Sequence, residues 1–239
     1  MLEIKNVEIY GLERSLCASG NPMSVGEINT KSSRYDPYKN ISNWDQIIKR
    51  SKSLGSAKSG SGHDNYLKGI IVQFDVKYPQ YWAPESQRYH WFEILSSQSK
   101  MHRLATMGRT DDFDTMFNKY VELSTIELVQ KYVHNYNILC EYQFSEEICD
   151  YYHVDRIVRY STKEELDKDK YFYFMKALSN LPMGFEMWET ISTNYLQLKG
   201  ILHQRYNHKL DEWRYFCEEM LKLPMFKELI GFDKEIKRL

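Results

Sequence analysis

The longest regular pattern in the chain is an apolar repeat, spaced by three and four residues, between Phe185 and Leu223. This spacing is typical of helices that bury one face. The repeat changes phase near Asn207 and His208, so it predicts two consecutive helices that meet at that point. Shorter stripes of the same kind predict further helices at residues 44–54, 85–102, 124–136 and 162–178.

Two other segments are typical of β-strands. Residues 1–12 alternate apolar and polar side chains, and residues 69–76 concentrate β-branched and aromatic ones. Between them, residues 53–62 are rich in Gly and Ser, which indicates either a flexible surface loop or a loop that contacts a ligand. We therefore predict an α+β fold, with long helices beside a small antiparallel or mixed sheet, and one domain spanning residues 1–239.

The charge balance argues against nucleic-acid binding, because 32 Lys and Arg face 33 Asp and Glu and leave a net charge of −1. No apolar run approaches the roughly 18–20 residues that cross a bilayer, and the first ten residues lack the apolar core of a signal peptide. We expect a soluble, cytoplasmic protein that contacts neither membrane nor nucleic acid. Its Tyr-, Lys- and Asn-rich composition is typical of a low-GC bacterium or its bacteriophage.

The common catalytic motifs are missing. The chain has no nucleophile elbow, no P-loop and no zinc-protease motif, and its seven histidines do not cluster with carboxylates at ligand spacing. The four cysteines are scattered and indicate buried thiols rather than disulfides. We predict no metal site.

Polar residues instead gather in four segments: residues 15–22, 62–65, 91–104 and 194–208. Small hydroxyls and amides beside a guanidinium suit a ligand that carries a phosphate and a base. Asn194 and Arg205 lie eleven residues apart, about three helical turns, and therefore share one helix face. Each segment alone also has a purely structural explanation. Residues 96–99 could be a solvated helix face, and Arg205 the ion-pair partner of a nearby Glu.

Taken together, the order and spacing of these segments resemble the flavin-dependent thymidylate synthases. The matching stretches include GHDNYLKGIIVQFDVKYP, which begins at Gly62, and TNYLQLKGILHQRYNHKLDEW, which begins at Thr193. The resemblance covers most of residues 12–222. It implies a homotetramer that binds FAD, uses NADPH and methylenetetrahydrofolate as co-substrates, and transfers a one-carbon unit to dUMP or a similar pyrimidine nucleotide.

The resemblance also implies roles for individual residues. Arg205 would polarise the uracil carbonyl, with Ser96 as the second catalytic residue. Gln98 and Arg103 would line the substrate pocket together with Arg205. The cofactor-binding residues that it implies are Ser19, His63, Asn65, Asn194 and His208.

Several positions depart from the family's motifs, and each departure removes a charge or a hydroxyl that would meet a ligand. They are Lys68, Trp91, Glu93, Met101, Leu104 and Leu178. One lost phosphate-binding Arg removes hydrogen bonds worth about 1.5–3 kcal/mol, unless Arg88, His90 or His102 compensates.

Three alternatives therefore stay open. The chain could be a divergent enzyme of this fold that acts on a pyrimidine nucleotide. It could be a catalytically inactive relative that serves as a nucleotide- or flavin-binding or protein-interaction module. It could also be an unrelated α+β protein whose matches are accidental.

Overall fold

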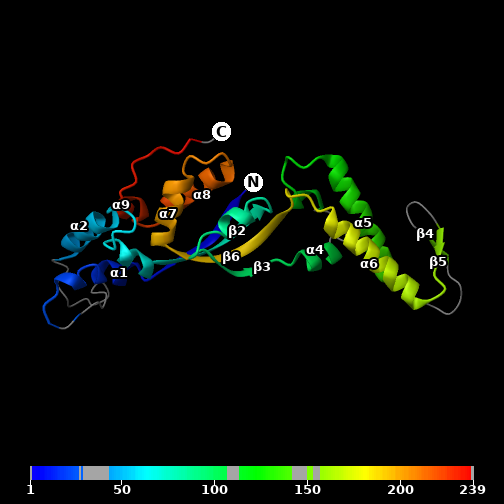
Figure 1. Cartoon of the computed structure of the whole chain (residues 1–239), viewed down its shortest axis with the longest axis horizontal. Helices are drawn as coiled ribbons and strands as arrows, with labels where there is room; N and C mark the ends of the chain where they lie inside the picture. The colour runs from blue at the N-terminus through cyan, green and yellow to red at the C-terminus, as the bar shows by residue number, and fades with distance from the viewer. Residues whose placement is uncertain are drawn as a thin grey trace. The chain divides into compact units, whose positions relative to one another are not determined.

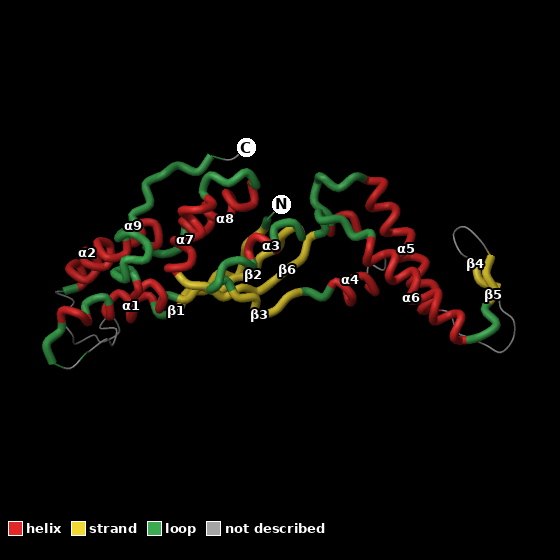
Figure 2. Tube along the Cα trace, in the orientation of Figure 1, coloured by secondary structure: helices red, strands yellow, loops and turns green. Residues whose placement is uncertain are grey.

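The computed structural model describes residues 2–26, 28, 43–106, 113–141, 150–152 and 157–237 (Figures 1 and 2). Two compact units divide the chain. The larger unit comprises Leu2–Tyr78, Trp82–Ser96 and Trp188–Leu239, and the smaller one comprises Pro79–Tyr81 and Ser97–Met187. The single domain over residues 1–239 stays a prediction.

A four-stranded sheet in the order β1-β2-β6-β3 lies almost entirely in the larger unit. Its strands are β1 (Glu3–Tyr10), β2 (Ile71–Pro79), β3 (Glu93–Ser97) and β6 (Glu186–Asn194). β1 pairs antiparallel with β2. Alternate side chains of β2 are buried, as the period of two requires for a strand with one face on a core. These elements confirm the predicted α+β class and both strands predicted near the N-terminus.

Helices α2 and α9 pack together in the larger unit, as do α7 and α8 (Figure 2). Five helices of this unit are α1 (Leu12–Ala18), α2 (Trp44–Gly55), α7 (Tyr195–Arg205), α8 (Asp211–Leu221) and α9 (Phe226–Ile230). Shorter helices of the same unit are η1 (Asn21–Met23), η3 (Asn65–Gly69) and α3 (Ala83–Ser86). Aromatic rings from β2, from residues 82–92 and from α8 form part of the core, with ring centroids 4.6–6.1 Å apart. They include Phe74, Trp82, Phe92, Trp213 and Phe216.

The smaller unit is built on two long helices, α5 (Leu123–Glu141) and α6 (Lys163–Ser179), packed against each other. α4 (Lys100–Thr106) packs on both. The unit also contains η4 (Phe113–Met116) and the pair β4 (Asp150–Tyr152) and β5 (Ile157–Arg159). A capping box between Thr162 and Glu165 begins α6 one residue later than the sequence pattern indicated. None of the described helices has the length and apolar character needed to cross a membrane.

One predicted helix is wrong, and another begins later than the sequence pattern indicated. Residues 85–102 form the short α3, then the edge strand β3 and the start of α4. Residues 186–194 form the strand β6, which alternates buried and half-buried side chains. Pairing with neighbouring strands outweighed the helical spacing, since short apolar runs fit both periods. The remainder of the long repeat is confirmed, because α7 and α8 flank a break at residues 206–210. Helix α1 was not predicted.

Two glycines provide a matched test of the packing in the larger unit. A Cβ on Gly55, at the end of α2, would lie 2.3 Å from the carbonyl oxygen of Leu229, whereas a Cβ on Gly200 in α7 meets nothing closer than 3.9 Å. We expect Gly55→Ala to lower the free energy of unfolding by about 1–3 kcal/mol. Gly200→Ala should raise it by about 0.5–1 kcal/mol. Urea denaturation of both variants measures the difference, and equal effects would contradict this packing.

Glu189 provides a test that depends on pH. The side chain is buried on β6, and burial raises its carboxyl pKa although a hydrogen bond with Tyr78 acts in the opposite direction. The folded state therefore binds the proton more tightly than the unfolded chain, and stability falls as pH rises through the folded pKa. We expect Glu189→Gln to be more stable than the unmodified protein at pH 7, with the advantage shrinking below the ordinary Glu pKa. Thermal unfolding across that pH range measures it, and a constant difference would contradict the assignment.

Candidate functional site

The first polar cluster joins the end of α1 to α2. Arg50 donates from Nε to the Ser19 hydroxyl at 3.1 Å, and the hydroxyls of Ser19 and Ser51 lie 3.1 Å apart. Ser19 donates in turn to the carbonyl oxygen of Leu16. A Cβ on Gly20 would lie 2.7 Å from the Arg50 guanidinium, so only glycine lets the chain approach this side chain so closely. Ser51 also donates to the Leu16 carbonyl oxygen, at 3.4 Å, and both hydroxyls are buried, so the groups of this cluster that suit a phosphate are the terminal nitrogens of Arg50.

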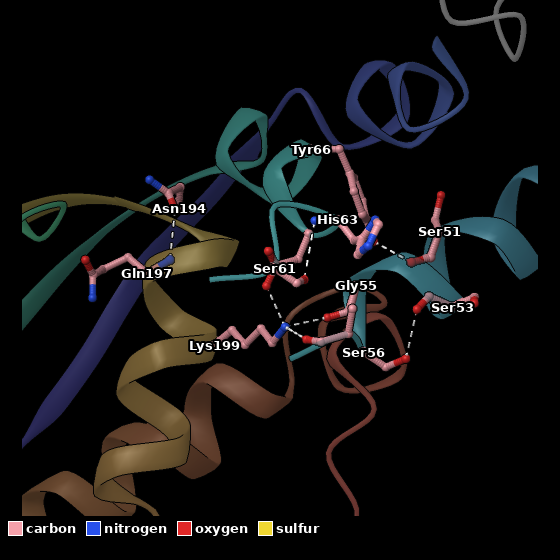
Figure 3. A network of polar contacts seen from close by, with 12 residues as sticks. Ser51, Ser53, Gly55, Ser56, Ser61, His63, Tyr66, Asn194, Gln197 and Lys199 are labelled. Atoms are coloured by element: carbon pink, nitrogen blue, oxygen red, sulfur yellow. Dashed lines mark hydrogen bonds and ion pairs between the residues drawn. The ribbon is translucent and has the colours of Figure 1, made fainter. Parts of the chain in front are cut away.

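A buried ion pair holds the turn that follows α2 (Figure 3). Lys199 Nζ lies 2.6 Å from Asp64 Oδ2 and also donates to the carbonyl oxygens of Gly55 at 2.8 Å and Ala57 at 2.6 Å. Both charged side chains are only 2% exposed. The first part of the Gly/Ser-rich segment at residues 53–62 is therefore held by hydrogen bonds to Lys199 and does not act as a flexible linker. Both residues lie within the polar segments noted in the sequence, but neither was predicted to be a site residue.

His63 and Asn65 flank the buried Asp64, and both are exposed. Tyr66 donates to the carbonyl oxygen of Ser51 at 2.7 Å, which ties their turn to the helix that carries Arg50. Figure 3 shows His63, Tyr66, Ser51 and Lys199 in one region of the larger unit. Three of the residues that were predicted to bind a cofactor, Ser19, His63 and Asn65, therefore lie on segments joined by direct hydrogen bonds.

Asn194 lies at the junction of β6 and α7. Its Oδ1 accepts the backbone N–H of Gln197 at 2.9 Å and caps the helix (Figure 3). The neighbouring Tyr195 N–H donates to the carbonyl oxygen of Ile70, which ties the start of α7 to the start of β2. Within the described parts of the chain the side-chain amide nitrogen of Asn194 donates no hydrogen bond. Asn194 thus has a structural role, and one donor remains for a ligand.

Arg205 ends α7 inside a polar network. Its Nη1 donates to Glu85 Oε2 at 2.9 Å, and its Nε donates to the Tyr89 hydroxyl at 2.7 Å. Tyr89 donates to Gln204, and the guanidinium lies 4.9 Å from the ring centroid of Trp213. Arg205 is therefore an ion-pair partner of a nearby Glu, the structural explanation considered from the sequence. Its place at the end of the helix that Asn194 begins agrees with the predicted spacing.

His208 belongs to the same network. Its Nε2 lies 3.5 Å from the Glu85 carboxylate, and its Nδ1 accepts the backbone N–H of Leu210. Burial lowers the imidazole pKa, and the negative charge of Glu85 only partly opposes that shift. No hydrogen bond joins His208 to Ser19, His63 or Asn194, all of which are described. Its role in holding a cofactor stays a prediction.

The three residues of the central segment are divided between the two units. Ser96 lies on β3, an edge strand whose side chains are all exposed, and no hydrogen bond joins it to Arg205. Gln98 and Arg103 belong to the smaller unit. There Arg103 donates to the backbone carbonyl of Glu186 and lies 4.7 Å from the ring centroid of Phe185, and burial lowers its pKa. Arg103 thus packs within its own unit, and a substrate role for these three residues stays a prediction.

Nearly the whole chain is similar to three solved structures of two enzymes. Two are structures of thymidylate synthase X from Helicobacter pylori with FAD and dUMP: one has a TM-score of 0.54 and 13% identity over 96% of this chain and 97% of that one. The other has a TM-score of 0.53 and 14% identity over 96% of both chains. The third is the UMP/dUMP methylase PolB from Streptomyces cacaoi bound with 5-Br dUMP, with a TM-score of 0.51 and 13% identity over 95% of this chain and 92% of that one.

Sequence comparison adds nothing to this likeness. No protein-family model matches the chain, and no curated protein matches it. The structural likeness extends over nearly all of each chain, so this chain has the fold of the flavin-dependent thymidylate synthases. The fold predicted from the order of the polar segments is confirmed.

Proposed function

We propose that this chain, which has the fold of the flavin-dependent thymidylate synthases, binds FAD through its larger unit and transfers a one-carbon unit to a pyrimidine nucleotide, either dUMP or an analogue. The observation that carries the proposal is the cluster of Ser19, Arg50 and Ser51, with the His63 turn tied to the same helix. The Arg50 guanidinium, which this cluster holds in place, would bind the phosphates of FAD.

The chemistry of the cluster fits a dinucleotide phosphate. The terminal nitrogens of Arg50 form no hydrogen bond with the described residues, so they remain available to an anion. Where the resemblance leads us to expect two arginines, this chain has Trp91 and Glu93. Arg50 would supply part of the positive charge that those positions lack. His63, Asn65 and the free amide of Asn194 would then contact other parts of the same flavin.

The pyrimidine nucleotide is assigned to the region of Arg205. Bound FAD would supply the redox chemistry, with NADPH as reductant and methylenetetrahydrofolate as the carbon donor. The chain's own contribution would be orientation and hydrogen bonding, with Arg205 donating to a carbonyl of the base. Ser96, Gln98 and Arg103 would act in the substrate pocket of a homotetramer. The exposed apolar side chains at Trp91 and Leu95, on and beside the edge strand β3, favour such an oligomer.

The test is a turnover assay with FAD, NADPH, methylenetetrahydrofolate and dUMP, in which dTMP formation is followed by chromatography. We expect dTMP, and expect Arg205→Gln to reduce its rate at least tenfold through the lost hydrogen bond to the base. A protein that takes up neither FAD nor a pyrimidine nucleotide would contradict the proposal.

The second candidate is a catalytically inactive relative that binds flavin or nucleotide. The ion pair of Arg205 with Glu85 favours it, because the guanidinium is already engaged, and so does Met101 at a position where the family's motif has a serine. Uptake of FAD and dUMP without any dTMP would support this second candidate over the first.

A further inference from the structure

The carboxylate of Glu85 is the centre of the network around Arg205. One oxygen, Oε2, accepts from Arg205 Nη1 at 2.9 Å and from the indole Nε1 of Trp213 at 2.9 Å, and the His208 imidazole lies 3.5 Å away. The residue comes from the short helix α3, and its partners come from α7, α8 and the turn between them. No sequence motif points to Glu85.

Two sets of contacts hold Glu85 and Arg205 in place. The side chain of Trp213 is completely buried, so movement of Glu85 would leave the indole N–H without a partner. Arg205 is fixed on its other side by the Tyr89 hydroxyl at 2.7 Å and by stacking on Trp213. A ligand that arrives here therefore meets a preformed ion pair and not a free guanidinium.

The ion pair leaves one acceptor and one donor unused. The second oxygen of Glu85, Oε1, and the second terminal nitrogen of Arg205, Nη2, form no hydrogen bond within the part of the chain that the structure describes. The Arg205 and Glu85 side chains are 16% and 25% exposed, so both are partly open to solvent. Because the two charges cancel, the pair attracts a phosphate weakly, whereas it complements an edge that presents a carbonyl beside an N–H.

We propose that Glu85 is a specificity-determining residue, which accepts the ring N–H of a uracil-type base while Arg205 donates to the adjacent carbonyl. This inference rests on the proposed function, which assigns the pyrimidine nucleotide to the region of Arg205. It adds a requirement that Arg205 alone would not impose. The ligand must carry a proton on the ring nitrogen, and an anionic group does not replace the base here.

The first experiment compares dUMP with N3-methyl-dUMP, which lacks that proton, by isothermal titration of the flavin-loaded protein. We expect the unmodified protein to bind dUMP at least about tenfold more tightly, the effect of one charge-assisted hydrogen bond. Glu85→Gln keeps an acceptor for Trp213 but turns an amide N–H toward the base. We therefore expect this variant to bind dUMP about tenfold more weakly and to bind dUMP and N3-methyl-dUMP equally well. Glu228→Gln, an exposed control on α9, should behave as the unmodified protein. Equal binding of the two nucleotides by the unmodified protein would overturn the inference.

The second experiment needs no nucleotide. Inorganic phosphate should raise the melting temperature of Glu85→Gln more than that of the unmodified protein, because Arg205 then carries an uncompensated charge. The added Arg205→Gln substitution should abolish the difference. An identical response of all three proteins would show that the pair does not neutralise Arg205, and would overturn the inference.

The outcomes also separate this inference from the proposed function. Uptake of FAD and dUMP without discrimination against N3-methyl-dUMP contradicts the role of Glu85 alone. Uptake of FAD without any pyrimidine nucleotide contradicts the role of Glu85 and the substrate assignment, and leaves the flavin site standing. A protein that takes up neither contradicts the proposed function, while the phosphate experiment still decides whether Glu85 neutralises Arg205.

Discussion

Lys199→Met is expected to lower the free energy of unfolding by about 3–5 kcal/mol, because it leaves the buried Asp64 carboxylate without its partner. The carbonyl oxygens of Gly55 and Ala57 lose their donor in the same step. A loss of this size is a large part of the total stability of an ordinary domain. Urea denaturation followed by circular dichroism measures it.

Two further variants make that prediction specific to the buried pair. Asp64→Leu combined with Lys199→Met removes both charges and should recover much of the loss, since an apolar pair of similar volume leaves no charge stranded. Lys222→Met breaks an exposed pair with Glu219 and should change stability by no more than about 0.5 kcal/mol. Similar effects of Lys199→Met and Lys222→Met would contradict the role assigned to the buried pair.

Arg50→Glu is expected to weaken FAD binding by a factor of about 100 or more. Two lost charge-assisted hydrogen bonds account for a factor of that order, and repulsion between the new carboxylate and the phosphates adds to it. Titration of the protein into FAD, followed by quenching of flavin fluorescence, measures the affinity.

Riboflavin and a matched charge reversal serve as the controls for this prediction. Riboflavin has no phosphate, so Arg50→Glu should leave its weaker binding unchanged. Lys52→Glu reverses an exposed charge on the same helix and should leave FAD binding within about twofold. Loss of riboflavin binding in Arg50→Glu would indicate a general structural defect, and unchanged FAD binding would show that the phosphates lie elsewhere.

The sequence correctly predicted the helices and strands that carry a clear local pattern of apolar or β-branched residues. The β-branched run after Gly69 forms β2, and the apolar stripes of α2, α5 and α6 form helices close to the predicted positions. It failed where tertiary pairing decides. Residues 93–97 and 186–194 carry apolar spacings that fit a helix, yet both pair as strands of one sheet. Whether such a segment pairs as a strand depends on segments far away in the chain, so its own residues do not reveal it.

The candidate site divides in the same way. Ser19, His63, Asn65, Asn194 and Arg205 were predicted because they match motifs whose order along the chain is readable. The residues that fix them were not predicted: Arg50, Asp64, Glu85 and Lys199. Lys and Glu are usually surface residues, so the sequence does not distinguish these two from any others. Only the fold shows that Lys199 is buried or that Glu85 pairs with Arg205.

Flavin uptake tests the central claim most directly. We predict that the purified chain, mixed with oxidised FAD and freed of excess by gel filtration, retains about one flavin per chain. The retained flavin should show a visible absorption spectrum shifted from that of free FAD, and the melting temperature should rise as FAD is added. Complete loss of flavin on the column, together with an unchanged melting temperature at saturating FAD, would contradict the claim.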